Sequence, residues 1–135
     1  MDTIRFRGKD KFGTWRYGFL LQDRSGYSAL VPIQYPLLQW KINLENELKF
    51  VYTKTLGQFV GIKDKKDIDI YEGDICRAEF NGVQYKILVV RFGTGWYGTT
   101  ESDGRCIIRE ILSSFKDIDK IGNIHDNSKL FIQSI

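Results

Sequence analysis

Cysteine, proline and histidine are scarce in this chain, and long apolar runs are absent. Its 135 residues include two cysteines, Cys76 and Cys106, two prolines and one histidine. Two cysteines without a CxxC spacing exclude a disulfide framework and the usual cysteine-based metal sites. No apolar run approaches the roughly 18 residues that a membrane helix needs, and the first residues lack the apolar stretch of a signal peptide. We therefore expect a cytoplasmic protein with reduced thiols and no membrane contact.

The composition is that of a folded protein with an uneven charge distribution. Hydrophobic residues make up 42% of the chain, aromatic residues 14% and charged residues 27%, which predicts a globular core and argues against disorder. Residues 1–66 carry 12 Lys+Arg and 6 Asp+Glu, a net charge of +6, whereas residues 67–135 carry 8 and 11, a net charge of −3. The sign changes at the charged turn 63–67. We therefore expect an N-terminal β-rich part, 1–66, and a C-terminal part, 67–135, in one closely packed unit or two small lobes.

The N-terminal part has the patterns of short strands. Residues 4–7 and 15–21 flank a glycine-containing turn and predict a β-hairpin. A further strand over 27–31 should end at Pro32, because proline cannot donate to a sheet ladder. Residues 50–52 and 59–62 resume β-like spacing, whereas residues 32–48 fit neither period and their conformation is not predicted.

The strongest local signal is a hairpin centred on Asn81-Gly82. Asn-Gly between two alternating runs predicts a two-residue type I′ turn, because both turn residues must take positive φ. That turn fixes the pairs, and it places the apolar residues of both strands on one face. The predicted pairs are Phe80 with Val83, Ala78 with Tyr85 and Cys76 with Ile87. Cys76 is therefore predicted to be a small buried hydrophobic residue.

The last third of the chain mixes two kinds of pattern. Ile108, Ile111, Leu112 and Phe115 have helical spacing and predict a short helix. Residues 118–124 predict a final strand, and residues 126–128 open a short turn or helix. The segment 92–98, Phe-Gly-Thr-Gly-Trp-Tyr-Gly, echoes 12–18, Phe-Gly-Thr-Trp-Arg-Tyr-Gly. Seven residues do not establish a duplication, and shared turn-to-strand chemistry explains the echo more simply.

Three ordered blocks of this chain resemble the YopX family of small phage and prophage proteins. The blocks are residues 4–9 followed by Trp15, Tyr17 and Gly18; residues 55–65 continuing to 70–75; and residues 121–127. Lys66-Asp67 departs from the family pattern, which usually has Asn-Gly in that turn. The resemblance implies a mainly β protein whose C-terminal part is similar to an SH3-like barrel. It implies a bacterial host cytoplasm and brings no established reaction, substrate or cofactor.

Candidate chemical sites are weak. His125 lies beside Asp126, a pair that can serve acid–base catalysis, but neither cysteine has a sequence link to it, and a surface histidine is favoured. Asp67, Asp69, Glu72 and Asp74 form an acidic cluster. Counted from Asp67, the cluster lacks the glycine and the glutamate that an EF-hand loop requires, so we favour a solvated acidic turn. We expect no enzyme activity, catalytic residue, metal, cofactor or small-molecule substrate.

The N-terminal hairpin is the best candidate interaction site. If Ile4 and Phe6 point inward, the arginines between and after them project together from the other face, with lysines and one further arginine extending the positive surface. Exposed aromatic side chains beside cations suit single-stranded nucleic acid. The residues of this predicted site are Arg5, Arg7, Lys9, Lys11, Arg16, Trp15 and Tyr17.

Two functions remain open. The leading hypothesis is a non-enzymatic module for protein–protein contact or assembly, including self-association between the basic and acidic parts. The alternative is a nucleic-acid-binding module that uses the basic hairpin.

Overall fold

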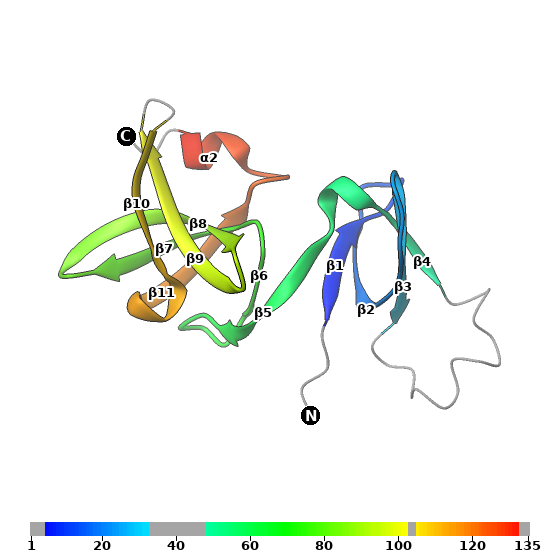
Figure 1. The fold of residues 1–135 in the computed structure, drawn as a ribbon, viewed down its shortest axis with the longest axis horizontal. Coiled ribbons are helices and arrows are strands. Elements are labelled where there is room, and N and C mark those ends of the chain that lie inside the picture. The colour runs from blue at the N-terminus through cyan, green and yellow to red at the C-terminus, as the bar shows by residue number, and fades with distance from the viewer. Residues whose placement is uncertain (1–4, 33–47, 103–104, 133–135) are drawn as a thin grey trace. The chain divides into compact units, whose positions relative to one another are not determined.

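The computed structural model describes residues 5–32, 48–102 and 105–132, so the unpredicted conformation of residues 33–47 lies outside the described residues. The described residues are mainly in β-strands, with a single short helix, and the predicted mainly β class is confirmed. It divides into two compact units, Met1–Phe59 (unit 1) and Val60–Ile135 (unit 2) (Figure 1). No helix among the described residues has the length and apolar content needed to cross a membrane.

Unit 1 is an antiparallel sheet with the strand order β4-β3-β2-β1-β5. The predicted hairpin is present, and β3 ends at Pro32 as expected. A short 3-10 turn, η1 (Thr53–Thr55), joins β4 to β5. The strands are β1 (Phe6–Lys9), β2 (Trp15–Asp23), β3 (Tyr27–Pro32), β4 (Lys49–Tyr52) and β5 (Gly57–Lys63), the last of which continues into unit 2.

The sheet of unit 1 coils until β1 lies against β4. A Cβ atom added to Gly8 of β1 would lie only 2.6 Å from a methyl carbon of Val51 of β4. Only glycine allows this approach. Val51 is completely buried, as is Leu30 of β3. The coil therefore brings the turn after β1 toward β4, although these segments are far apart in sequence.

Unit 2 contains a second antiparallel sheet with the order β10-β9-β8-β7-β11. Four strands follow one another as a meander, a 3-10 turn follows, and the last strand returns to pair with the first. β10 and β11 are the two edges of this sheet in the described part of the chain, so the expected barrel is not closed. The elements are β6 (Asp69–Tyr71, beside β5), β7 (Asp74–Phe80), β8 (Val83–Phe92), β9 (Gly95–Ser102), β10 (Arg105–Ile111), η2 (Leu112–Ser114), β11 (Lys116–Asn123) and α2 (Ser128–Ile132).

The Asn-Gly hairpin forms as predicted. Asn81 and Gly82 have φ angles of 50° and 79°, which is the type I′ requirement. All three predicted pairs are observed, and Cys76 is completely buried, as expected. Val83, at the tip of the hairpin, is the exception to the inward face because it is half exposed.

The helix predicted from the spacing of Ile108 to Phe115 is wrong. Residues 105–111 form β10, which pairs along its length with β9. The 3-10 turn η2 follows, in which the backbone N–H of Phe115 donates to the carbonyl of Leu112. A 3-10 turn also brings residues three apart to one side, so Leu112 and Phe115 are both buried without a helix. Pairing with β9 overrides the local pattern.

The core of unit 2 lies on one face of its sheet. A Cβ atom added to Gly98 would lie 2.7 Å from Ile87 and 2.9 Å from the ring of Phe115. This glycine therefore lets the segment after η2 pack directly on β9. The core residues are Ile70, Cys76, Ala78, Ile87, Val89, Leu112, Phe115 and Ile118.

Candidate functional site

The structure divides the predicted basic hairpin between two faces of the unit 1 sheet. Arg7 pairs with Tyr17 and Lys9 pairs with Trp15, so these four side chains share one face, together with Arg5. Arg16 pairs with Gly8 and lies on the opposite face. The prediction that Arg16 joins Arg5 and Arg7 on one surface is therefore wrong, because the register places it one residue out of phase.

Arg7 does not project into solvent as the sequence suggested. Only 2% of this residue is exposed, and its guanidinium carbon lies 4.6 Å from the centroid of the Trp15 ring. Arg5 stacks in a similar way on Phe59, at 4.0 Å, and Lys9 lies 5.5 Å from Trp15. Cation–π contact with aromatic rings explains why these charged side chains lie close to the sheet surface.

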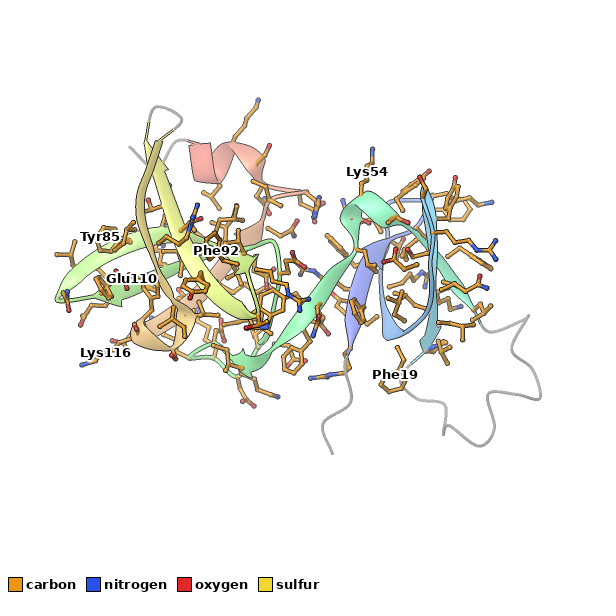
Figure 2. The ribbon with its side chains drawn as sticks, in the orientation of Figure 1. Phe19, Lys54, Tyr85, Phe92, Glu110 and Lys116 are labelled. Carbon is orange, nitrogen blue, oxygen red and sulfur yellow. The ribbon has the colours of Figure 1, made fainter. Side chains whose placement is uncertain are left out.

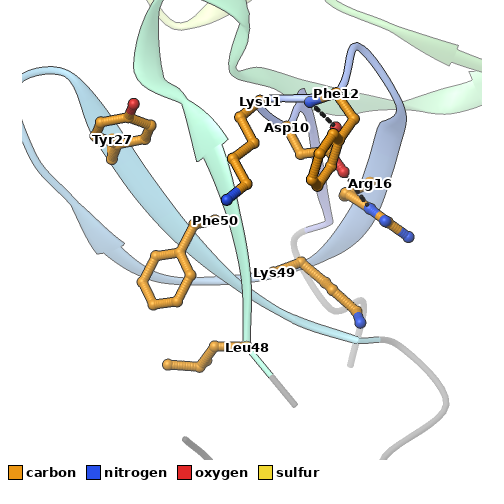
Figure 3. A pocket seen from close by; sticks show the side chains of 8 residues that line it. All are labelled: Asp10, Lys11, Phe12, Arg16, Tyr27, Leu48, Lys49 and Phe50. Carbon is orange, nitrogen blue, oxygen red and sulfur yellow. Dashed lines mark hydrogen bonds and ion pairs between the residues drawn. The ribbon is translucent and has the colours of Figure 1, made fainter. Parts of the chain in front are cut away.

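Lys11 and Arg16 of the predicted set instead line a pocket in unit 1 (Figure 3). The pocket has a volume of about 250 Å³, below the roughly 300–1,000 Å³ of a site for a drug-sized ligand. The pocket can therefore hold one aromatic ring or one side chain, but not a whole cofactor. Its lining residues are Asp10, Lys11, Phe12, Arg16, Tyr27, Leu48, Lys49 and Phe50.

Asp10 organises one wall of the pocket. One carboxylate oxygen accepts hydrogen bonds from the backbone N–H groups of Phe12 and Thr14, both at 2.9 Å, and the other accepts from Nε of Arg16 at 2.9 Å. The backbone N–H of Thr14 lowers the pKa of Asp10 most; burial opposes this, and Arg16 and Phe12 add to the lowering. The charged carboxylate thus holds the turn in one conformation, with Lys11 and Phe12 projecting from it.

Strands β3 and β4 form the other wall. Tyr27 pairs with Tyr52, and Ala29 pairs with Phe50, so Tyr27 and Phe50 share one face of the two strands. The Tyr27 and Tyr52 rings are 5.2 Å apart. A hydrogen bond to Tyr27 raises the pKa of Tyr52 above its ordinary value.

The pocket combines exposed aromatic rings with positive charge. Phe12, Tyr27 and Phe50 are 77%, 54% and 56% exposed, although large aromatic side chains usually fill cores. The ammonium nitrogen of Lys11 lies 5.1 Å from the centroid of the Phe12 ring, and Figure 3 shows the Lys11 side chain between the rings of Phe12 and Phe50. The site can therefore stack a flat group and attract an anion at once.

Six of the lining residues were not predicted from the sequence. A usable signal is the Lys-Phe dipeptide, which occurs at 11–12 in a turn and again at 49–50 at the start of a strand. Nothing in the sequence shows that these two places meet, because the coil of the sheet brings them together. The unpredicted residues are Asp10, Phe12, Tyr27, Leu48, Lys49 and Phe50.

Two residues of the acidic cluster of unit 2 form ion pairs with lysines. Asp74 is completely buried and lies 3.0 Å from Nζ of Lys120, so the expectation of a solvated turn is wrong for this residue. Asp69 lies 3.6 Å from Nζ of Lys63. No group of three or more His, Cys, Asp or Glu residues in the described ranges could hold a metal ion.

Cys76 and His125 do not share a site. The Cys76 thiol lies in the core, where burial, with a smaller contribution from Asp74, raises its pKa to about 12. His125 is exposed, in a turn where Asn123 accepts a hydrogen bond from the His125 backbone N–H. A cysteine–histidine pair therefore does not form between these two residues.

Comparison with known proteins identifies a matching family. The model of one protein family, described as YopX protein, matches residues 6–131. The match covers most of the chain and spans both units. No curated protein matches the chain.

Proposed function

This chain belongs to the YopX family, and we propose that it is a non-enzymatic phage or prophage protein that binds single-stranded nucleic acid in the bacterial cytoplasm. The observation that carries the proposal is the pocket of unit 1, where three aromatic rings more than half exposed stand beside Lys11, Arg16 and Lys49. Proteins that bind single strands use this combination of stacking rings and a positive groove.

The aromatic rings would provide the stacking platforms. A base held on Phe12 or Phe50 contributes about 1–3 kcal/mol by stacking, whatever its identity. Bases inside a duplex already stack on one another, so exposed rings favour a single strand over a duplex. The small volume of the pocket agrees with the insertion of one base at a time.

The cations would contact phosphates. Asp10 accepts a hydrogen bond from Nε of Arg16 and so orients the guanidinium plane. The terminal nitrogens of Arg16 can then reach a phosphate oxygen. Lys11 and Lys49 add two further positive charges to the lining of the pocket. Asp10 forms an ion pair with Arg16 and offsets its charge, so the net positive charge of the lining comes from Lys11 and Lys49. Of the basic hairpin predicted from sequence, this proposal keeps Lys11 and Arg16.

Unit 2 is proposed to be an SH3-like module. A four-strand meander, a 3-10 turn and a final strand that returns to the first are the order of elements in such modules, and unit 2 has them from β7 to β11. The turn Gly73-Asp74 that opens β7 supports the same assignment, with Gly73 at φ 91°.

A titration of the full chain tests the proposal. Fluorescence anisotropy with labelled single-stranded DNA, single-stranded RNA and duplex DNA should give saturable binding that favours single strands and weakens as salt rises. Phe50→Leu should weaken binding about fivefold to about 150-fold, because it removes stacking worth about 1–3 kcal/mol. Phe50→Trp, which keeps an aromatic platform, is the matched control. Absence of binding at low salt, or wild-type affinity of Phe50→Leu, would contradict the proposal.

The uneven charge distribution favours a second candidate, self-association or contact with a protein partner. Residues 1–66 are positive and residues 67–135 are negative, so two chains can attract each other at low salt. Light scattering at high protein concentration tests self-association, and a monomer at low salt would contradict it.

A further inference from the structure

The sequence echo between 12–18 and 92–98 is also a structural echo. Phe12 and Phe92 each stand at the turn of a hairpin and are 77% and 55% exposed. The glycines that follow, Gly13 and Gly93, both have positive φ, 80° and 63°. Each segment then ends in a glycine that packs too closely for a side chain. Unit 2 therefore presents its exposed phenylalanine by the same local device as unit 1.

Phe92 lies in a cluster that we define as the Phe92 surface: Phe92, Tyr97, Arg109 and Ile111. The Arg109 guanidinium carbon lies 4.6 Å from the centroid of the Phe92 ring. The Tyr97 ring meets the Phe92 ring edge-on, with centroids 5.7 Å apart, and Ile111 is 46% exposed. The strand register places all four on one face of β8, β9 and β10.

The charge of this surface is positive. Arg109 is exposed and is the charged residue among its four members. Glu110 follows Arg109 along β10 and so alternates to the opposite face of the sheet, as Arg91 does before Phe92 along β8. A guanidinium stacked on an aromatic ring offers both a flat face for a base and a fork of donors for a phosphate.

We infer that the Phe92 surface is a second contact site for single-stranded nucleic acid. The ligand class rests on the function proposed for unit 1, and the recurrence of an exposed phenylalanine with a cation over its ring supports it here. Two weak sites on one chain bind a long strand much more tightly than either site alone, because the second contact is intramolecular. A strand long enough to reach both units should gain affinity, whereas a short strand should not.

The test compares Phe92→Leu with Phe50→Leu in the full chain. The probes are labelled oligothymidines of about 8 nucleotides and about four times that length, within and beyond the usual single-site range. Phe92→Leu should reduce the stoichiometry of the short probe from two per chain to one. It should weaken binding of the long probe at least about fivefold.

Matched variants separate stacking from general effects. Phe92→Trp should bind as the wild type does. Arg109→Gln should weaken binding of the long probe, whereas Lys116→Gln, which removes one charge from the exposed start of β11, should have little effect (both Phe92 and Lys116 are labelled in Figure 2). Thermal unfolding by circular dichroism confirms that each variant is folded.

The outcomes distinguish the two sites. If Phe92→Leu keeps wild-type stoichiometry and affinity while Phe50→Leu loses binding, the function of unit 1 stands and the Phe92 surface is not a second site. If Phe50→Leu has no effect and Phe92→Leu abolishes binding, unit 1 is excluded and the Phe92 surface is retained. If Phe92→Leu changes only the mass measured by light scattering, this face is a protein contact and the inference is overturned.

Discussion

Nζ of Lys120 lies 3.0 Å from a carboxylate oxygen of Asp74, a residue that is fully shielded from solvent. The same oxygen accepts a hydrogen bond from the backbone N–H of Tyr71 at 2.7 Å, and Lys120 also donates to the carbonyl of Asp69. The pair therefore joins β11 to the turn that begins β7, at the place where the chain enters the main sheet of unit 2.

Loss of Lys120 should strongly destabilise unit 2. Lys120→Met leaves a buried carboxylate without its cation, which costs about 3–5 kcal/mol in proteins generally. Urea unfolding should show a lower midpoint, and Lys116→Met, at an exposed position of the same strand, should leave it nearly unchanged. Adding Asp74→Asn to Lys120→Met should recover part of the loss. Equal stability of Lys120→Met and the wild type would contradict the structural role of the pair.

The lysines of the unit 1 pocket should determine its salt dependence. Removing a lysine that binds a phosphate reduces the slope of log affinity against log salt by about 0.7 for a single strand. The double variant Lys11→Gln/Lys49→Gln should therefore reduce the slope by about 1.4. Lys54→Gln, an exposed lysine of unit 1 outside the pocket (labelled in Figure 2), is the control. An unchanged slope in the double variant would show that phosphates bind elsewhere.

Stability should fall at acidic pH because of Asp64 and Asp10. Burial raises the pKa of Asp64. Hydrogen bonds from the backbone N–H groups of Ile68, Lys120 and Lys66 lower it by more, so the net shift is downward. The pKa of Asp10 is lowered as well. A carboxyl whose pKa is lowered in the folded state stabilises the fold at pH values above its ordinary pKa, 3.8. This contribution is lost as the pH falls through the folded-state pKa.

Urea unfolding at several pH values between neutral and strongly acidic measures this effect. Asp64→Asn should flatten the acid limb of the curve, because the group that takes up the proton is gone. If the free energy of unfolding of the wild type stayed constant through the acidic range, the fold would not stabilise the ionised form of these carboxyls.

Cys76 should resist alkylation in the folded chain. A pKa of about 12 leaves almost no thiolate at neutral pH, and the residue is completely buried. Iodoacetamide followed by peptide mass spectrometry should modify Cys76 only after denaturation. Rapid modification under native conditions would show that the core of unit 2 opens frequently.

Local chemistry made much of the fold predictable. Asn81-Gly82 determines its own turn and, through it, every pair of the hairpin. Alternation identified the first hairpin because β1 and β2 are joined by a short turn. Helical spacing misled at 108–115. Ile108 and Ile111 belong to the edge strand β10, Leu112 belongs to the 3-10 turn η2, and Phe115 follows that turn. The local pattern there is the same for both structures.

The candidate site was less predictable because it depends on contacts between distant segments. Lys11 and Arg16 were identified from their charge, but Phe50 and Lys49 reach them only because Gly8 allows β1 to lie against β4. The alternation that assigned Arg7 to solvent cannot show that it stacks on Trp15. The sequence indicated the chemistry of a basic, aromatic surface, and the sheet determined which residues form it.

The turn at Asn81-Gly82 is also a site where the chain can change chemically during storage. In an Asn-Gly pair the glycine has no side chain to hinder attack of its backbone nitrogen on the asparagine amide, so the pair is prone to deamidation. The isoaspartate that results adds one backbone atom to a turn of two residues, and the type I′ geometry depends on that length. Old preparations would then carry a displaced register from Phe80 and Val83 inward. Freshness of the sample thus becomes a structural variable in any comparison of variants.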